Sequence, residues 1–384
     1  MTNLKAQAEL YVDEHYKFGA KEAELAEFMD HARRVREVQT ALAAKHSDGT
    51  AARVFHAKSH GCLAGRLTLI DERPEFTRHG LFGAASTAYN VMARFSNGVG
   101  LEQHDLKPDV RGLALKVFGV RDSAAATSDQ KPRTVDFLMT NSTNPFGSDQ
   151  EEFVQFMEAN ANPGVLNAHL IGFLSAHTGV ARLLMKATLK FVPSVATEQY
   201  WSGHAYLLGP QQAMKFNVRP IEQKRSESDE ELLKETAKLA QISDAPGDGL
   251  ESRVRRWLQM RTVTNSVIDP NYLAFELRDR LRRTPIKFVL SVQLAKDAQR
   301  TPIENGLMEW KEADSPSVPV AELTLDRVID SADIRNLRFT PGHFIPEHRP
   351  LGNLGRGRIF TYESSQIGRH ADIDEPDENR FFSS

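Results

Sequence analysis

The sequence predicts an α+β fold in which an antiparallel sheet, closed as a barrel, is surrounded by helices. Three observations lead to this prediction. Short runs of alternating apolar residues with turn residues between them occupy residues 53–141 and return in residues 286–325. Helical periodicity fills residues 21–46 and much of the chain between the two strand-rich blocks. A sheet of many short strands must also hide its edges, which favours closure.

The first element is a long amphipathic helix from Lys21 to His46, because apolar residues recur there at spacings of three and four with charges between them. We therefore divide the chain into an N-terminal helical arm, residues 1–50, and a barrel domain with helical insertions, residues 51–384. The strands expected in the first block are, in chain order, Arg53–Lys58, Cys62–Ile70, Tyr89–Ser96, Arg111–Val120 and Thr134–Asn141.

The strand that ends at Asn141 has an unusual last residue. Strict alternation places the Asn141 amide on the same face as Val135, Phe137 and Met139, which have core character. A buried amide needs hydrogen-bond partners, so this position is a candidate site residue.

The middle of the chain is expected to be helical. A capping box of Ser148 and Glu151 marks one helix start. The most apolar stretch of the chain is Val165–Met185, which overlaps the next expected helix; its histidines and Arg182 favour a buried helix over a membrane span. The remaining expected elements are helices at Leu166–Val192, Asp229–Ile242 and Leu250–Met260, a surface loop at Glu222–Glu231, and strands at Ile286–Leu294 and Val318–Leu325.

Composition excludes several classes of protein. The 384 residues are 40% hydrophobic and 26% charged, which describes a globular chain with a large core. Lys+Arg 48 against Asp+Glu 51 gives a net charge of -3, so the bulk balance favours neither nucleic acid nor a membrane surface as partner. A single cysteine, Cys62, and early acidic residues in place of a secretory signal lead us to expect a cytoplasmic protein without a transmembrane segment.

The segment from Arg358 to Arg369 carries the most informative chemistry. On a helix, Arg358, Tyr362, Ser365 and Arg369 follow at steps of four, three and four and share one face. Spacing alone leaves open a solvated helix surface, which is a common use of such stripes. The chemical alternative is that an arginine one turn before a tyrosine stabilises the phenolate, and a phenolate can be an anionic ligand for ferric iron.

This segment resembles the haem-ligating helix of the catalase superfamily, whose haem ligand is a tyrosine. Other segments resemble the family pattern in the same order along the chain. They are Arg53-Val54-Phe55-His56-Ala57-Lys58, the segment of the distal histidine; Arg94-Phe95-Ser96, a haem-pocket strand; Asp109-Val110-Arg111-Gly112, the motif that follows it; and Asp136 to Asn141, the strand of the distal asparagine.

The resemblance implies one haem b and a role for each matching residue. Tyr362 is the implied iron ligand and Arg358 its charge partner. His56 is the implied distal acid–base, Asn141 its polar partner and Ser96 the residue that orients it. Arg53, Arg94 and Arg369 are the implied partners of the haem propionates, and Phe55 lies beside the distal base. Strict alternation would put Arg53 and His56 on opposite faces of a strand, so we expect a bulge or strong twist there.

The resemblance is to the short, catalase-related branch of the family, which includes peroxidases and a coral allene oxide synthase. The chain ends fifteen residues after Arg369, and Phe55 stands where catalases usually have valine. The implied activity is that of a haem-dependent oxidoreductase acting on organic or lipid hydroperoxides and on hydrogen peroxide, with an organic reductant as a further candidate partner. A fatty-acid hydroperoxide isomerase or lyase, a true small catalase, and a non-enzymatic haem-binding or sensing protein are the alternatives. The sequence leaves open whether the chain forms a homo-oligomer.

Overall fold

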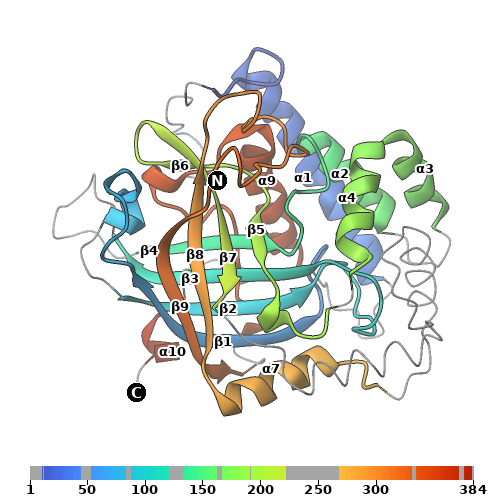
Figure 1. Ribbon diagram of the computed structural model, residues 1–384. Coiled ribbons are helices and arrows are strands. Elements are labelled where there is room, and N and C mark those ends of the chain that lie inside the picture. Colours follow the sequence, from blue (N-terminus) through green and yellow to red (C-terminus); the bar gives the residue numbers. More distant parts are fainter. Residues whose placement is uncertain are drawn as a thin grey trace.

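The computed structural model describes residues 11, 13–44, 53–83, 88–121, 133–161, 167–190, 192–221, 268–330, 334–371 and 376–382 (Figure 1). Its centre is an antiparallel barrel, as the sequence predicts. The strands are β1 (Ser59–Leu69), β2 (Ala88–Asn97), β3 (Arg111–Val120), β4 (Arg133–Thr140), β5 (Tyr200–Ser202), β6 (Tyr206–Leu208), β7 (Gln212–Pro220), β8 (Ile286–Leu294) and β9 (Val318–Ile329).

The barrel closes because β5 pairs with both β4 and β7. The closed ring of eight strands runs β1-β2-β3-β4-β5-β7-β8-β9 and returns to β1, while β6 pairs with β7 outside the ring. A glycine is required where the ring bends. The register of β1 against β9 shifts between Ala64 and Gly65, and a Cβ on Gly65 would lie only 1.9 Å from the carbonyl oxygen of Thr324.

Aromatic and branched side chains fill the barrel. Phe137 of β4 and Phe216 of β7 meet edge to face at 4.8 Å between ring centroids, and Phe95 of β2 lies 6.3 Å from Phe288 of β8. All four rings are at most 2% exposed. Side chains from opposite walls therefore meet in a packed core, which holds the strands that carry the site in fixed register.

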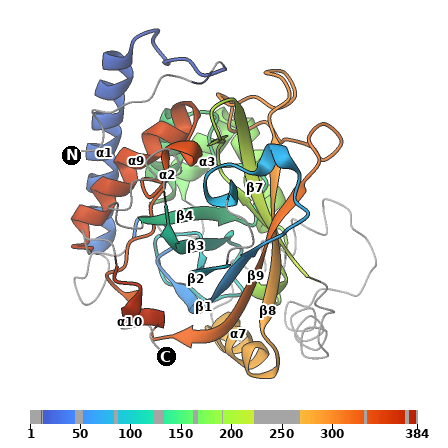
Figure 2. The same ribbon diagram turned by 90° about the vertical axis from the view of Figure 1, so that its left-hand side faces the viewer.

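Helices cover the outside of the barrel. They are α1 (Lys21–Ala43), α2 (Gln150–Asn160), α3 (Ala168–Ala176), α4 (Thr178–Thr188), α7 (Tyr272–Arg283), α9 (Gly352–Gly368) and α10 (Asn379–Phe382), with short 3-10 turns at Glu75–Thr77, Gly80–Gly83, Val195–Thr197 and Pro346–His348. Figure 2 shows α1 and α9 side by side against one flank of the barrel. A Cβ on Gly357 of α9 would lie 2.8 Å from the Phe28 ring of α1 and 2.5 Å from Cγ of Gln150, so this glycine lets three helices meet.

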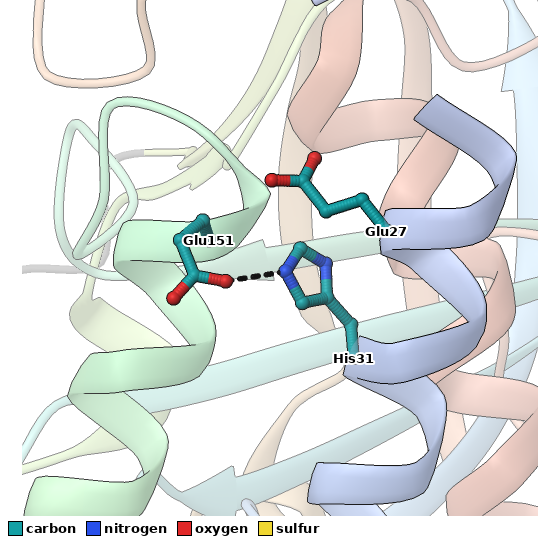
Figure 3. Close-up of side chains that lie close together, drawn as sticks. All are labelled: Glu27, His31 and Glu151. Carbon is teal, nitrogen blue, oxygen red and sulfur yellow. Dashed lines mark hydrogen bonds and ion pairs between the residues drawn. The ribbon is translucent and has the colours of Figure 1, made fainter. Parts of the chain in front are cut away.

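Ion pairs join α1 to α2 beside this contact (Figure 3). The imidazole of His31 is fully buried and its Nε2 lies 2.6 Å from Glu151 Oε2. Arg34 Nη1 donates to the same carboxylate oxygen at 2.7 Å, and Lys17 pairs with Glu27 at 2.7 Å. Glu27, His31 and Glu151 lie close enough to hold a metal ion. Both carboxylates already have cationic partners, however, so we regard the cluster as a structural tie that fixes α1.

Several sequence predictions about local structure are wrong. Residues 53–58 do not form a strand: β1 begins only at Ser59, and His56 has a left-handed backbone with φ 60. The predicted helix Leu166–Val192 is broken, because His177 adopts a non-helical φ of -115 and ψ of 67 between α3 and α4. The capping box lies one residue later than predicted, since Asp149 caps the backbone N–H of Glu152 and the Glu152 side chain accepts from the N–H of Ser148.

Other elements extend beyond what the pattern predicts. Helix α9 begins at Gly352, inside the glycine-rich stretch that precedes Arg358, and β5, β6, β7 and α7 were not predicted. The expected helices at Asp229–Ile242 and Leu250–Met260, and the loop at Glu222–Glu231, lie outside the described residues. Within the described part of the chain, no helix combines the length and apolar character that crossing a membrane requires.

Candidate functional site

A cavity of about 510 Å³ lies between the barrel wall and the covering helices. This volume is within the range of small-molecule sites. Eight of the nine site residues predicted from the sequence line it, and they come from the loop before β1, from β2 and from α9 with its C-terminal cap: Arg53, Phe55, His56, Arg94, Ser96, Arg358, Tyr362 and Arg369. The structure therefore brings together residues that are more than three hundred positions apart in the sequence.

His56 owes its orientation to the loop before β1. The left-handed backbone at His56 turns the chain, and the backbone N–H of His56 donates to the carbonyl of Gly98 at 2.9 Å. Its Nδ1 lies 2.5 Å from the carbonyl oxygen of Asn97 and 3.2 Å from Ser96 Oγ. A carbonyl can only accept, so Nδ1 carries the proton and Nε2 keeps its lone pair.

The imidazole of His56 is held in the neutral form. Burial lowers the pKa of His56 to about 4; the Asn97 carbonyl opposes this shift, and the guanidinium groups of Arg94 and Arg358 add to it. At neutral pH the ring is therefore a base whose Nε2 can take up a proton.

Gly112 of β3 forms the floor under this imidazole. A Cβ at position 112 would lie 2.5 Å from His56 Nδ1, 2.7 Å from His56 Cε1 and 2.7 Å from Ser96 Oγ. All three distances are shorter than side-chain atoms tolerate, so only glycine lets the ring rest on the strand. The sequence contains this residue in the Asp109–Gly112 motif, but spacing alone assigns it no role.

The phenol of Tyr362 lies at another wall of the cavity. Arg358 Nη2 donates to Tyr362 Oη at 2.7 Å, as expected for residues one helical turn apart, and Arg358 Nη1 lies 3.0 Å from Nδ1 of His204. Burial disfavours the Arg358 charge, but the Tyr362 and Tyr206 phenols outweigh burial and keep the pKa of Arg358 above its ordinary value. Arg358 therefore stays cationic and stabilises negative charge on the Tyr362 oxygen.

Two residues that sequence reasoning missed help to hold this guanidinium. A Cβ on Gly203 would lie 2.9 Å from Arg358 Nη1, so the absence of a side chain there makes room for Arg358. His204 stacks on Tyr206 with 4.4 Å between centroids, and burial followed by the Arg358 charge keeps its pKa well below the ordinary value. A neutral His204 can accept from Arg358 through Nδ1. Neither residue has a sequence signal, because both lie in the short turn between β5 and β6.

Three arginines converge at one end of the cavity. Arg53 Nη2 and Arg369 Nη2 both donate to the Leu337 carbonyl, at 3.0 and 3.1 Å, and Arg94 Nη2 donates to the His56 carbonyl at 2.8 Å. Burial lowers the pKa of Arg53 to about 10, and burial together with the Arg53 charge holds the pKa of Arg94 well below its ordinary value. Among the described residues, neither Arg53 nor Arg94 has a carboxylate partner.

Buried cations without counter-ions are costly, so this end of the cavity suits a ligand with acidic groups. The Cys62 thiol nearby does not neutralise them, because burial raises its pKa to about 12.

Asn141 is the predicted site residue that does not line the cavity. It lies one residue beyond the end of β4, where strand alternation no longer determines side-chain direction. Its Oδ1 accepts from the backbone N–H of Arg111 at 2.8 Å, and its Nδ2 donates to Glu198 at 2.9 Å. The amide is thus buried and partnered, as predicted, but it joins β3 to the segment before β5 instead of facing His56.

The part of the cavity wall formed by Phe55 and helices α2, α3 and α4 is mainly apolar, whereas another part carries polar and charged side chains such as Glu102, Lys107 and Asp109. Phe55 packs against Phe153 and Phe156 of α2, with ring centroids 6.0 and 6.1 Å apart. Beyond these rings the cavity is lined by Leu170 of α3 and Leu184 of α4. The cavity therefore has a cationic end and an apolar end.

Comparison with known proteins identifies the fold. No family model and no curated protein sequence matches the chain. Among solved structures, a fungal catalase superposes with a TM-score of 0.62 at 16% identity over 84% of this chain and 60% of the catalase. A bacterial catalase gives 0.62 at 17% identity, over 85% of this chain and 61% of that one. Catalase A from Saccharomyces cerevisiae gives 0.62 at 14%, with coverages of 84% and 62%. The chain thus has the catalase fold and spans about three fifths of these catalases.

Proposed function

We propose that the protein is a haem-dependent enzyme that acts on hydroperoxides, and that the Tyr362 phenolate would bind the iron. The observation that carries the proposal is the convergence on one cavity of a phenol held by a buried guanidinium and a neutral histidine with a free Nε2. The catalase fold supports the same assignment, because the solved structures it resembles are catalases.

The residues that line the cavity fit a haem b. A flat, apolar ring system with two carboxylates needs apolar walls and cations at one end. Phe339, Leu138 and Ala114 line the cavity with apolar surface, and Arg53, Arg94 and Arg369 offer the guanidinium groups that two propionates would neutralise. The Tyr362 phenolate would supply the anionic oxygen ligand that suits ferric iron. When bound, the haem supplies the electrons that cleave the peroxide O–O bond.

The chain's own residues supply the proton transfers. The neutral Nε2 of His56 accepts the proton of the hydroperoxide group, and the resulting imidazolium returns it to the oxygen that leaves. The Asn97 carbonyl holds Nδ1–H and so keeps Nε2 as the reactive nitrogen, while Ser96 restricts the ring from the same side. We assign no catalytic role to Asn141, because its amide is bonded to Arg111 and Glu198.

The apolar end of the cavity favours organic hydroperoxides over hydrogen peroxide. The ring of Phe55 lies 6.5 Å from the imidazole of His56, centroid to centroid, and packs against the rings of Phe153 and Phe156. An alkyl or aryl group that buries apolar surface against such rings gains about 1.5–3 kcal/mol, which hydrogen peroxide cannot gain. We therefore place lipid or other organic hydroperoxides before hydrogen peroxide as substrates.

Steady-state turnover of the haem-loaded protein tests this proposal. Oxygen evolution from hydrogen peroxide and consumption of cumene hydroperoxide are measured for the wild type, for Phe55→Val and for a control, Phe76→Val, which alters a 40% exposed ring that is not among the cavity-lining residues. We expect greater efficiency with the organic peroxide and a shift of about tenfold towards hydrogen peroxide in Phe55→Val alone.

Each other outcome identifies one of the alternatives. Vigorous oxygen release without organic turnover indicates a true small catalase. Consumption of a fatty-acid hydroperoxide without a reductant indicates an isomerase or lyase. Haem retention without turnover of either peroxide indicates a binding or sensing protein.

A further inference from the structure

The helix pair α3 and α4 has an exposed apolar surface that the proposed chemistry does not use. The sequence predicts a buried helix here, but of the nine residues of α3 only Leu170 is buried. Ile171 is 55% exposed and Met185 of α4 is 41% exposed. Met308, 40% exposed, lies in the loop that abuts α4, where a Cβ on Gly179 would come within 3.0 Å of Leu307.

A helix on the surface of a protein in water normally turns charged residues outward. In α3 the only polar side chains are His169 and Ser175, and the other exposed positions are alanine, glycine and isoleucine. Figure 1 shows α4 and then α3 beyond α2, with α3 farthest out on that side of the described part of the molecule. A group of exposed apolar residues on adjacent elements is typical of a surface that binds a partner.

The charge of this segment favours an anionic partner. Between Glu158 and Glu198 the chain contains no acidic residue, while Arg182, Lys186 and Lys190 follow at four-residue steps on and just after α4. Lys186 reaches Glu309 and Lys190 reaches Glu198, whereas exposed Arg182 has no ion pair among the described residues. Apolar helices with basic residues and no acidic ones are typical of protein surfaces that lie on anionic lipid. Because carboxylates of other segments pair with Lys186 and Lys190, the unbalanced positive charge of this segment is that of Arg182.

The same two helices form the apolar end of the cavity. Leu170 of α3 and Leu184 of α4 line it, so their inner faces contact the cavity while their outer faces contact solvent. In the described structure, α3 and α4 therefore separate the cavity from the exposed apolar surface.

We propose that α3 and α4 dock on the surface of an anionic lipid bilayer and place the apolar end of the cavity next to the acyl chains. The exposed apolar surface and its charge are the evidence for lipid binding. Only the purpose of that binding, which is access for lipophilic hydroperoxides, rests on the proposed function. The exposed residues Ile171 and Met185 enter the boundary between headgroups and acyl chains, and Arg182 contacts the lipid phosphates.

Sedimentation of the full-length protein with lipid vesicles tests the proposal. We expect binding to vesicles of phosphatidylcholine with phosphatidylglycerol, weaker binding to phosphatidylcholine alone, and weakening by salt. Ile171→Glu should lower the partition coefficient about tenfold or more, and Arg182→Gln about fivefold with the anionic vesicles only. Phe275→Glu on α7 is the matched control, because Phe275 is 56% exposed, like Ile171, but lies on a different element. The control should bind as the wild type does.

Three results would overturn the proposal. The first is a wild type that stays in the supernatant with both kinds of vesicle, and the second is equal binding of Ile171→Glu and Phe275→Glu. The third is a wild-type dimer in sedimentation velocity that Ile171→Glu dissociates, which would make this face an interface between copies of the chain. Peroxide turnover in detergent-free buffer is measured on the same samples, so a failure to bind lipid is distinguished from a failure of the proposed function.

Discussion

Replacing Gly112 with alanine tests whether the position of His56 controls reactivity. The added Cβ would lie 2.5 Å from His56 Nδ1, whereas ordinary contact begins at 3.4 Å. The imidazole must therefore move outward by about 0.9 Å, or β3 must move away from it by the same amount. The ring cannot turn aside freely, because Nδ1 is held to the Asn97 carbonyl at 2.5 Å.

The expected effect is large on rate and modest on stability. A displacement of about 1 Å in a catalytic group costs about a hundredfold in rate. Packing one extra methyl group into a filled site costs about 1–3 kcal/mol of unfolding free energy. Gly112→Ala should therefore fold, retain haem and react with cumene hydroperoxide about a hundred times more slowly than the wild type.

Stopped-flow reaction of the haem-loaded protein with the peroxide measures this rate, and haem content and thermal unfolding are measured on the same sample. Gly172→Ala is the control, since no atom lies within 4 Å of a Cβ at that position. A wild-type rate in Gly112→Ala would refute the argument that the ring of His56 must rest on β3 in order to react.

Three further predictions follow from the same site and its surroundings. Removing the base in His56→Ala should lower the rate of peroxide reaction by about a hundredfold to ten-thousandfold while haem content stays unchanged; equal rates would exclude His56 as the proton carrier. Arg94→Gln removes a buried charge that has no carboxylate partner among the described residues, so haem should dissociate more readily while the haem-free protein unfolds at a higher temperature than the wild type. A lower unfolding temperature would show that this buried charge does not destabilise the folded chain. Burial lowers the pKa of His348 to about 4, and its Nε2 accepts from the N–H of Leu81 at 3.0 Å. The unfolded chain takes up this proton below about pH 6.5 and the folded chain only near 4, so stability falls as the pH falls through that window, by about 3 kcal/mol at pH 4. Denaturant unfolding of His348→Gln should lack this part of the pH dependence, and an unchanged pH profile would show that His348 does not titrate as described.

Helical spacing was sufficient to predict one part of the site. The four-residue step from Arg358 to Tyr362 fixes both side chains on one face of α9, and the structure places their polar atoms 2.7 Å apart. The closed barrel was also predictable, because many short strands require protected edges. Both predictions depend on periodicity, which a sequence displays directly.

Features that depend on how distant segments meet could not be predicted in this way. The contact of His56 with Ser96 requires the left-handed turn at His56 and the pairing of β1 with β2, neither of which has a local signal. The side chain of Asn141 was predicted to share the core face because side chains alternate along a strand, but the strand β4 ends at Thr140. Helix α3 was expected to be buried because it is apolar, but burial depends on what covers a helix, and little of the described chain covers this one.

The ferric absorption spectrum of the haem-loaded protein tests the central claim most directly, with Tyr362→Phe compared against Tyr206→Phe. Tyr206 is the matched control because its buried ring lies near the same arginine but is not among the residues that line the cavity. The account predicts a spectrum of anionic-oxygen ligation in the wild type and in Tyr206→Phe, and loss of that spectrum or of haem in Tyr362→Phe. An unchanged spectrum and haem content in Tyr362→Phe would contradict the assignment of Tyr362 as the iron ligand.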